Sequence, residues 1–341
     1  MTQSVALGSG IWSTTIDDTP VSLSVRGSTA VVGGADGHAW FVDLSSGSVT
    51  DRIDVGDGLL TVSLSPSGEH LVTTSMAGYA LWSCADQRLL LEAGGGWSVR
   101  AAWASEERFA VASGRRALVH SADGELLWET EPAASTVTDV AWMRAGRRLV
   151  VAAYGEVSAH ERHQSRPVKV YPYIGSHLAL AISPTGQWIC SGNQDASIHI
   201  WRARDASELT MSGYPDKVTQ LVFDESGRWL AADGAPDITI WDFSGKGPEG
   251  RMPLSLRAHD RITAMAWRPG SAEHLASGGD DGTVALWNAT AGTPQQAVGP
   301  ARTMQMDAEI AAVAWAGPER LVAVDRSGEM RVFDVLDLGS L

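Results

Sequence analysis

The sequence predicts an all-β protein in which one four-stranded unit is repeated eight times and the units close into a ring. Two observations support this fold class. A short strand ending at a tryptophan, or at a residue that replaces it, recurs about every 40 residues, which is the period of a repeated sheet unit. Each repeat also begins with a run of alternating apolar residues, as a half-buried strand requires. With 36 glycines and 14 prolines, the chain is interrupted too often for long helices.

The best-preserved unit contains the stretch His274–Asn288, which reads HLASGGDDGTVALWN. Two short apolar runs flank the acidic, glycine-rich bend Gly278–Gly282, a pattern typical of an antiparallel hairpin. Upstream, Ala258 and His259 precede another alternating run, Ile262–Trp267, which we expect to be the first strand of the unit.

The other units follow when the chain is aligned on Trp287. Its position is taken by Val42, Trp82, His120, His160, Trp201, Trp241 and Phe333. The first strands begin near Val21, Leu60, Val99, Val137, Leu178, Val218, Ile262 and Ile310. A sheet of this kind can bury its faces only against neighbouring sheets, so the array is expected to close into a ring.

These features resemble the WD repeat, the blade unit of WD-type β-propellers. The residues that carry the resemblance are Ala258-His259 (usually Gly-His), Ser277, Asp281 and Trp287-Asn288 (usually Trp-Asp). The resemblance implies one closed β-propeller domain over residues 1–341, with degenerate, bacterial-type repeats at approximately 17–336. Eight first strands indicate eight four-stranded blades. Seven blades is the alternative, because the third, fourth and sixth units are degenerate.

Closure of the ring is also predicted from the sequence. The last unit ends at Val332–Asp334, with too little chain left for its outermost strand. A spare strand-like segment, Ser9–Ile16, precedes the first unit and would complete the last blade. Such a clasp is known from WD-type propellers, and it covers a strand edge that would otherwise promote aggregation.

Four polar or aromatic residues of the seventh unit match the family's structural hydrogen-bond network, which implies that they hold the blade together. They are His259, Ser277, Asp281 and Trp287. A Ser–His–Asp set also suggests hydrolysis, but the spacing explains these residues as a blade lock, and no catalytic residue is predicted. We expect Asp281 to be buried, and Asp280 and Arg261 to be free to meet a partner.

Two segments interrupt the even spacing of the units, and both are expected to be long surface loops. Ser244–Arg251 is interpreted as a tolerated insertion in the sixth unit. Gly299–Glu309 leads into the eighth unit and contains Met304 and Met306, so a tolerated insertion and a binding loop both remain open for it.

Composition limits the classes of function. The formal charge of −14 argues against nucleic acid as a partner, and no apolar run is long enough to span a membrane. The start of the chain lacks the features of a signal peptide, so a cytoplasmic location is expected. Cys84 and Cys190 are interpreted as reduced, buried residues. Cys190 and His199 should point to opposite faces of one hairpin, and no metal site or cofactor is predicted.

The loops at the contact end of such a propeller are predicted to be acidic. The acidic residues in them are Asp17, Asp18, Asp36, Asp54, Asp57, Glu92, Glu131, Asp216, Asp260, Asp280, Asp307 and Glu309. Arg115, Arg116, Lys217 and Arg261 are the basic ones. Such a face would favour a basic partner.

The middle of each first strand should line the central channel, which places Arg100 and Asp139 in neighbouring blades and Gln220 further round. Trp97, Tyr171 and Tyr173 lie in entry loops, as possible interface anchors. The candidate partner-binding residues are Trp97, Arg100, Asp139, Lys217, Gln220, Asp260, Arg261, Asp280 and Glu309.

The predicted function is a non-catalytic scaffold, monomeric on its own, that binds one or more proteins with a basic contact surface on its acidic loops. Two alternatives stay open. One is a metal-binding protein or an accessory factor of a metalloenzyme, suggested by nine histidines, Met304, Met306 and the cysteines. The other is a propeller enzyme with a site at the mouth of the channel, since propellers can build sites from single residues of several blades.

Overall fold

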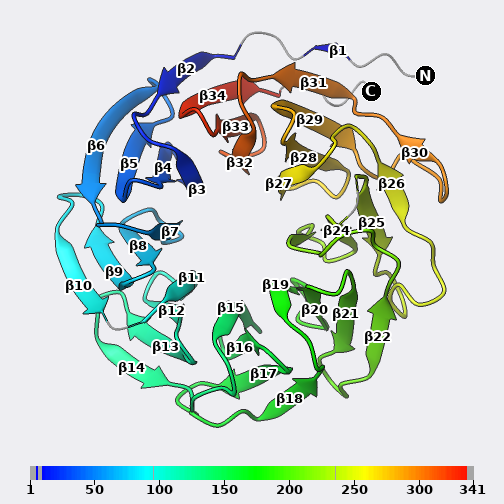
Figure 1. Cartoon of the computed structure of the whole chain (residues 1–341), viewed down its shortest axis with the longest axis horizontal. Coiled ribbons are helices and arrows are strands. Elements are labelled where there is room, and N and C mark those ends of the chain that lie inside the picture. The colour runs from blue at the N-terminus through cyan, green and yellow to red at the C-terminus, as the bar shows by residue number, and fades with distance from the viewer. Residues whose placement is uncertain (1–4, 7–9, 95, 235, 336–341) are drawn as a thin grey trace.

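The computed structural model describes residues 5–6, 10–94, 96–234 and 236–335. Every regular element of these residues is a β-strand, and the strands form eight sheets arranged around a central axis (Figure 1). The all-β prediction and the count of eight blades are confirmed, and the seven-bladed alternative is wrong. The degenerate third, fourth and sixth units each form a complete blade, because alternation of apolar residues is enough to pack a sheet without the motif residues.

The first four blades follow one another in the sequence. Blade 1 contains β3 (Pro20–Arg26), β4 (Thr29–Gly34), β5 (His38–Asp43) and β6 (Ser48–Asp54). Blade 2 contains β7 (Leu59–Leu64), β8 (His70–Ser75), β9 (Gly78–Ser83) and β10 (Leu89–Gly94). Blade 3 contains β11 (Ser98–Ser105), β12 (Arg108–Ser113), β13 (Arg116–Ser121) and β14 (Leu126–Glu129). Blade 4 contains β15 (Val137–Met143), β16 (Arg148–Ala153), β17 (Glu156–Glu161) and β18 (Lys169–Pro172).

The remaining blades complete the ring and include two short additions. Blade 5 contains β19 (His177–Ile182), β20 (Trp188–Asn193), β21 (Ile198–Arg202) and β22 (Glu208–Met211). Blade 6 contains β23 (Leu221–Phe223), β24 (Trp229–Ala232), β25 (Ile238–Asp242), β26 (Leu254–Leu256) and the added β30 (Ala297–Val298). Blade 7 contains β27 (Ile262–Trp267), β28 (His274–Gly279), β29 (Thr283–Asn288), β31 (Arg302–Gln305) and the added β1 (Val5–Ala6). Blade 8 contains β32 (Ile310–Trp315), β33 (Arg320–Asp325), β34 (Glu329–Asp334) and β2 (Trp12–Thr15).

The predicted clasp is confirmed. Strand β2 pairs antiparallel with β34, from Trp12 opposite Val332 to Thr15 opposite Glu329, and it completes the last blade (Figure 1). Ser9, the first residue of the predicted clasp, lies outside the described residues. The indole of Trp12 donates a 3.1 Å hydrogen bond to the carbonyl of Leu44 in blade 1, so the clasp also joins the two ends of the ring.

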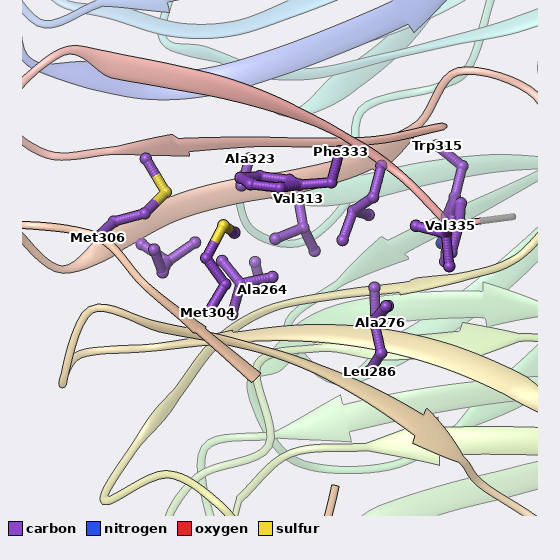
Figure 2. Close-up of a cluster of buried hydrophobic side chains, with 13 residues drawn as sticks. Ala264, Ala276, Leu286, Met304, Met306, Val313, Trp315, Ala323, Phe333 and Val335 are labelled. Carbon is purple, nitrogen blue, oxygen red and sulfur yellow. The ribbon is translucent and has the colours of Figure 1, made fainter. Parts of the chain in front are cut away.

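The prediction for Gly299–Glu309 is wrong. Strand β31, inside this stretch, pairs with β29 as the fourth strand of blade 7. Met304 and Met306 are buried between blades 7 and 8, beside Val313 and Phe333 (Figure 2). The extra chain lies earlier, between β29 and β31, where β30 pairs in parallel with the outer strand of blade 6. The two methionines are therefore core residues.

The hydrophobic core is divided among the blade-to-blade contacts. Between blades 7 and 8, Ala264, Ala276 and Leu286 face Trp315 and Val313 (Figure 2). Comparable buried clusters lie between other neighbouring blades. Each sheet is covered on both faces by its two neighbours. A single blade outside the ring would therefore expose its apolar faces to water.

Tryptophans at the ends of four inner strands add polar connections between blades. Each indole donates a hydrogen bond of about the ideal length to a carbonyl on the inner strand of the preceding blade. The pairs are Trp103 to Ser63 (3.1 Å), Trp142 to Ala102 (2.9 Å), Trp267 to Val222 (2.9 Å) and Trp315 to Ala266 (3.0 Å). These bonds fix the spacing of adjacent inner strands, which apolar packing alone specifies less tightly.

We predict that Trp142→Phe lowers the free energy of unfolding by about 1 kcal/mol, because a bond between blades 3 and 4 is lost while most of the ring packing is kept. Denaturant unfolding of the whole chain measures this. Trp97→Phe is the matched control, since Trp97 is exposed and its indole makes no hydrogen bond to a described residue. Equal stability of the Trp142→Phe variant and the wild type would contradict the prediction.

Candidate functional site

Two kinds of connection meet at one end of the ring: the loops that lead from one blade to the next, and the turns between the second and third strands of each blade. We call this end the loop face. Most of its predicted acidic residues are exposed: Asp17, Asp36, Asp54, Asp57, Glu92, Glu131, Asp216, Asp260 and Asp307. The candidates Lys217 and Trp97 are exposed there too. The role of these residues in binding stays a prediction.

The prediction that Asp18 belongs to this acidic surface is wrong, because its side chain is buried. One carboxylate oxygen accepts hydrogen bonds from the backbone amides of Thr19 (2.7 Å) and Asp36 (3.0 Å). The other lies 3.3 Å from the His38 ring and 3.5 Å from the Trp40 indole nitrogen. Asp18 therefore supports blade 1 and is not available to a partner.

Three of the candidate partner-binding residues are bonded to one another. The Arg261 guanidinium lies 3.3 Å from Asp280 and 3.3 Å from Glu309. Its backbone amide also donates to Asp280, at 3.0 Å. The expectation that Asp280 and Arg261 are free is therefore wrong, because each satisfies the other. Solvent-exposed ion pairs contribute little stability, so a partner could replace them at small cost.

A cavity of about 420 Å³ opens on the loop face between blades 6 and 7. Lys217, Asp260 and Arg261 line it, so the fold brings Lys217 close to two candidates that lie far from it in the sequence. Asp233 lies at its wall and accepts bonds from the amides of Thr219 (2.8 Å) and Gln220 (3.0 Å). Burial raises the pKa of the Asp233 carboxyl, against the lowering effect of these donors.

Asp233 was not predicted from the sequence, although a signal for it exists. Its register position in blade 6 corresponds to Gly278 in blade 7, where only a small residue fits because the Ile310 side chain packs directly against the backbone. Most other blades have glycine, alanine or threonine there. An aspartate among small residues marks blade 6 as locally different, and β23 is correspondingly short.

The loop face also carries exposed apolar side chains over blades 2 to 5. Ile174 is 86% exposed, Met76 64%, Trp97 51% and Tyr154 49%. Only Trp97 was predicted. The other two aromatic candidates are structural: Tyr171 is fully buried against Trp201, and Tyr173 stacks on the His199 ring and donates a hydrogen bond to Asp195. The alternation of a strand says nothing about loop residues, so exposure of Met76, Tyr154 and Ile174 could not be read from the sequence.

The blade 7 network has the hydrogen bonds that the motif implies. The Ser277 hydroxyl lies 2.7 Å from Nε2 of His259 and accepts a 2.8 Å bond from the Trp287 indole. Nδ1 of His259 lies 3.4 Å from Asp281. The prediction that Asp281 is buried is wrong, because its side chain is 29% exposed. Ser277 and Trp287 are buried, so no substrate reaches this hydroxyl.

Blade 5 reaches a similar arrangement by another route. His177, at the start of β19, places Nδ1 3.0 Å from the Ser191 hydroxyl. His199 pairs with Glu208 on the same face, while Cys190 points into the core shared with blade 6. The predicted separation of Cys190 and His199 is therefore confirmed. Among the described residues, no three His, Cys, Asp or Glu side chains are grouped to hold a metal ion.

Of the remaining candidates, Arg100 and Asp139 lie on inner strands and Gln220 lies directly before β23. Arg100 bonds to Asp139 through Nε, at 3.2 Å. Gln220 donates a 2.8 Å bond to the carbonyl of Thr263 in blade 7. Both contacts join neighbouring blades. The described part of the chain contains no helix long and apolar enough to cross a membrane.

Comparison with known proteins agrees with this architecture. Residues 167–202 and 250–288 match the family described as WD domain, G-beta repeat. The chain is an eight-bladed β-propeller in which these two segments match the WD repeat. The second match includes the complete blade 7 network, and the first includes most of blade 5.

Two solved structures show the same fold as this propeller. The computationally designed protein Ika8 has a TM-score of 0.79 and 19% sequence identity, over 97% of this chain and 100% of its own. Sqt1 from Chaetomium thermophilum has a TM-score of 0.79 and 17% identity, over 96% of this chain and 100% of its own. At these identities the likeness concerns the fold alone.

We predict that Ser277→Ala in this propeller lowers the free energy of unfolding by about 1 to 3 kcal/mol, because the buried Trp287 indole loses its acceptor. Denaturant unfolding measures the change. Thr293→Ala is the control, since it removes an exposed hydroxyl that bonds only to Gln296. A loss no larger than that of the control would show that the network does not stabilise the blade.

Stability is also expected to fall at mildly acidic pH. Burial lowers the pKa of His120, His160 and His259, and lowers that of His177 from 6.5 to about 4. The unfolded chain therefore takes up protons first as the pH falls. The stabilisation by neutral His177 is complete above pH 6.5 and is lost between pH 6.5 and about 4.

The measurement is the free energy of unfolding across this pH range for the wild type and for His177→Gln. We expect the wild type to lose more stability than the variant, with a difference of up to roughly 3 kcal/mol. Comparing the two chains removes the contribution of carboxylates, which both share. Parallel pH profiles would contradict the prediction.

Proposed function

We propose that this propeller is a non-catalytic docking platform whose loop face binds a protein partner that presents basic groups around apolar anchors. The observation that carries the proposal is the position of the exposed apolar side chains. Proteins with WD repeats usually act as interaction scaffolds, and the loop face is the surface proposed for that role here.

Single exposed apolar residues are normal on a protein surface, but their clustering is informative. Ile174, Met76, Trp97 and Tyr154 are four of the five most exposed large apolar side chains of the described residues. All four lie on the loop face. The fifth, Met252, lies at the opposite end, in the connection between β25 and β26. An aromatic and a methionine in loops held by a rigid ring are suitable anchors for a partner.

Charge supports a basic partner. The exposed carboxylates of the loop face include Asp54, Asp57 and Glu92 beside the apolar residues of blade 2, and Asp216 and Asp260 at the cavity. Carboxylates of one sign on one face accelerate encounter with a basic surface, in a salt-dependent way. The Arg261 pairs with Asp280 and Glu309 can exchange for contacts with a partner, because they are exposed.

The two alternatives have less support in the geometry. Met304 and Met306, which suggested metal binding, pack in the core between blades 7 and 8. Ser277 is the only member of the Ser–His–Asp set that could act as a nucleophile, and it is fully buried within blade 7. Met304, Met306 and Ser277 thus stabilise the fold, whereas the exposed apolar side chains of the loop face have no such structural role.

The test compares two methionines of similar exposure at opposite ends of the ring. We predict that Met76→Ala and Trp97→Ala weaken binding of the stoichiometric partner captured by the wild-type chain roughly ten-fold each, because each removes a central apolar contact. Met252→Ala is the matched control and should retain the partner. The affinity of the purified complex is measured for all four chains.

Ionic strength provides a second readout. The association rate of the wild-type complex should fall as salt increases, since screening weakens the attraction between the acidic face and a basic partner. Failure of the wild type to retain any stoichiometric partner would count against the proposal. Equal loss of binding in Met252→Ala and Met76→Ala would exclude the loop face as the docking surface.

A further inference from the structure

The central channel holds a cavity of about 500 Å³ whose walls differ in chemistry. The inner strands of blades 1 to 4 contribute hydroxyl groups and charged side chains, among them Ser22, Ser24, Thr61 and Arg100. The inner strands of blades 7 and 8 contribute an apolar wall that includes Ala266, Val313 and Ala314. This volume is within the range of small-molecule sites in proteins.

The charged residues of the cavity are Arg26, Arg100 and Asp139. The balance is positive, in a chain whose formal charge is −14. Asp139 does not face the cavity as a free anion. Its oxygens accept bonds from Nε of Arg100 (3.2 Å), from its own neighbour Val140 (2.8 Å) and from the amide of Leu180 in the next blade (3.0 Å).

The two partners of this ion pair differ in accessibility. The Asp139 side chain is 6% exposed and the Arg100 side chain is 53% exposed, although Arg100 lies in the middle of an inner strand. Arg100 bonds to Asp139 through Nε alone. The two amino groups of Arg100 form no hydrogen bond to a described residue. Asp139 therefore acts as a positioning residue that orients the guanidinium and leaves its donors to the cavity.

The serines of blade 1 provide further donors. Ser22 Oγ accepts the amide of Val62 (3.1 Å), and Ser24 Oγ accepts the amide of Leu64 (3.0 Å), both across the gap to blade 2. Because each oxygen is already an acceptor, its own hydroxyl proton remains available to donate. Arginine amino groups together with serine hydroxyls are the donors that bind carboxylates and phosphates.

We propose that the channel binds an oxyanion, a carboxylate or a phosphate, between Arg100 and the hydroxyls of Ser22 and Ser24. The rest of the ligand lies against the apolar wall of blades 7 and 8. The ring stands as a rigid frame around the site, so the donors are arranged before the ligand arrives. Arg26 is the last residue of β3 and Pro269 lies just beyond the end of β27, so this cavity extends toward the end opposite the loop face. The inference is thus independent of the proposed docking function.

The oxyanion has two possible sources, a free small molecule or the acidic side chain of a protein. The experiment titrates the whole chain by calorimetry, in low-chloride buffer, with inorganic phosphate, with citrate and with a hexaglutamate peptide. The variants are Arg100→Gln, which removes the donors, and Arg100→Lys, which keeps the charge without the planar fork. Arg204→Gln is the control, since this arginine is 85% exposed in a turn outside the channel.

We expect saturable binding in the millimolar range or tighter, weakened roughly ten-fold or more by Arg100→Gln and less by Arg100→Lys. Arg204→Gln should bind as the wild type does. Binding of phosphate or citrate with this dependence assigns the site to a small molecule. Binding of hexaglutamate alone, with the same dependence, assigns it to an acidic side chain.

Other outcomes overturn the proposal. These are the absence of saturable binding by all three probes, binding that Arg100→Gln and Arg100→Lys leave unchanged, and binding that Arg204→Gln weakens as much as Arg100→Gln does. Should Arg100→Gln fail to fold, Arg100→Lys and Ser24→Ala decide the result, because they change the two kinds of donor to which the proposal assigns the oxyanion. Unchanged binding in both would then count against a site in the channel.

Discussion

The structure depends on one constraint: a four-stranded blade has two apolar faces and can cover them only with its neighbours. The consequence is visible in the buried clusters, which lie between blades and combine residues from both. Closure by β2 follows from the same constraint, because the last blade would otherwise present an unpaired edge on β34. The tryptophan-to-carbonyl bonds between inner strands then set the spacing that the packing requires.

This constraint explains why the most motif-like residues are structural. In blade 7, His259, Ser277 and Trp287 form a buried chain of hydrogen bonds that holds the hairpin to the loop before it. Blade 5 repeats only part of this network: His177 lies 3.0 Å from the Ser191 hydroxyl, but the buried Trp201 indole has no hydrogen-bond partner among the described residues. The groups left for binding are those that the ring does not use, on the loop face and along the channel.

The inner strands have two tasks at equivalent positions. Ser22, Asp139 and Gln220 each bond to the next blade, and so help to close the ring. Arg100 differs, since it bonds through one nitrogen to an oriented carboxylate and presents the rest of its guanidinium to the cavity. A position that is structural in most blades thus offers a binding group in one of them.

The sequence by itself determined the fold class, the number of blades and the clasp, because alternation of apolar residues and a period of about 40 residues are local properties of the chain. It also identified the partners of Ser277, which lie within one unit. The tertiary structure decided which loops and strands meet. It placed Met304 and Met306 in the core, turned Asp18 inward, paired Arg261 with Asp280 and Glu309, and gathered Met76, Tyr154 and Ile174 on one face. These outcomes depend on how turns and side chains meet in three dimensions, within one blade for Asp18 and Arg261 and between blades for Met304 and Met306. The alternation of apolar residues along a strand does not encode them.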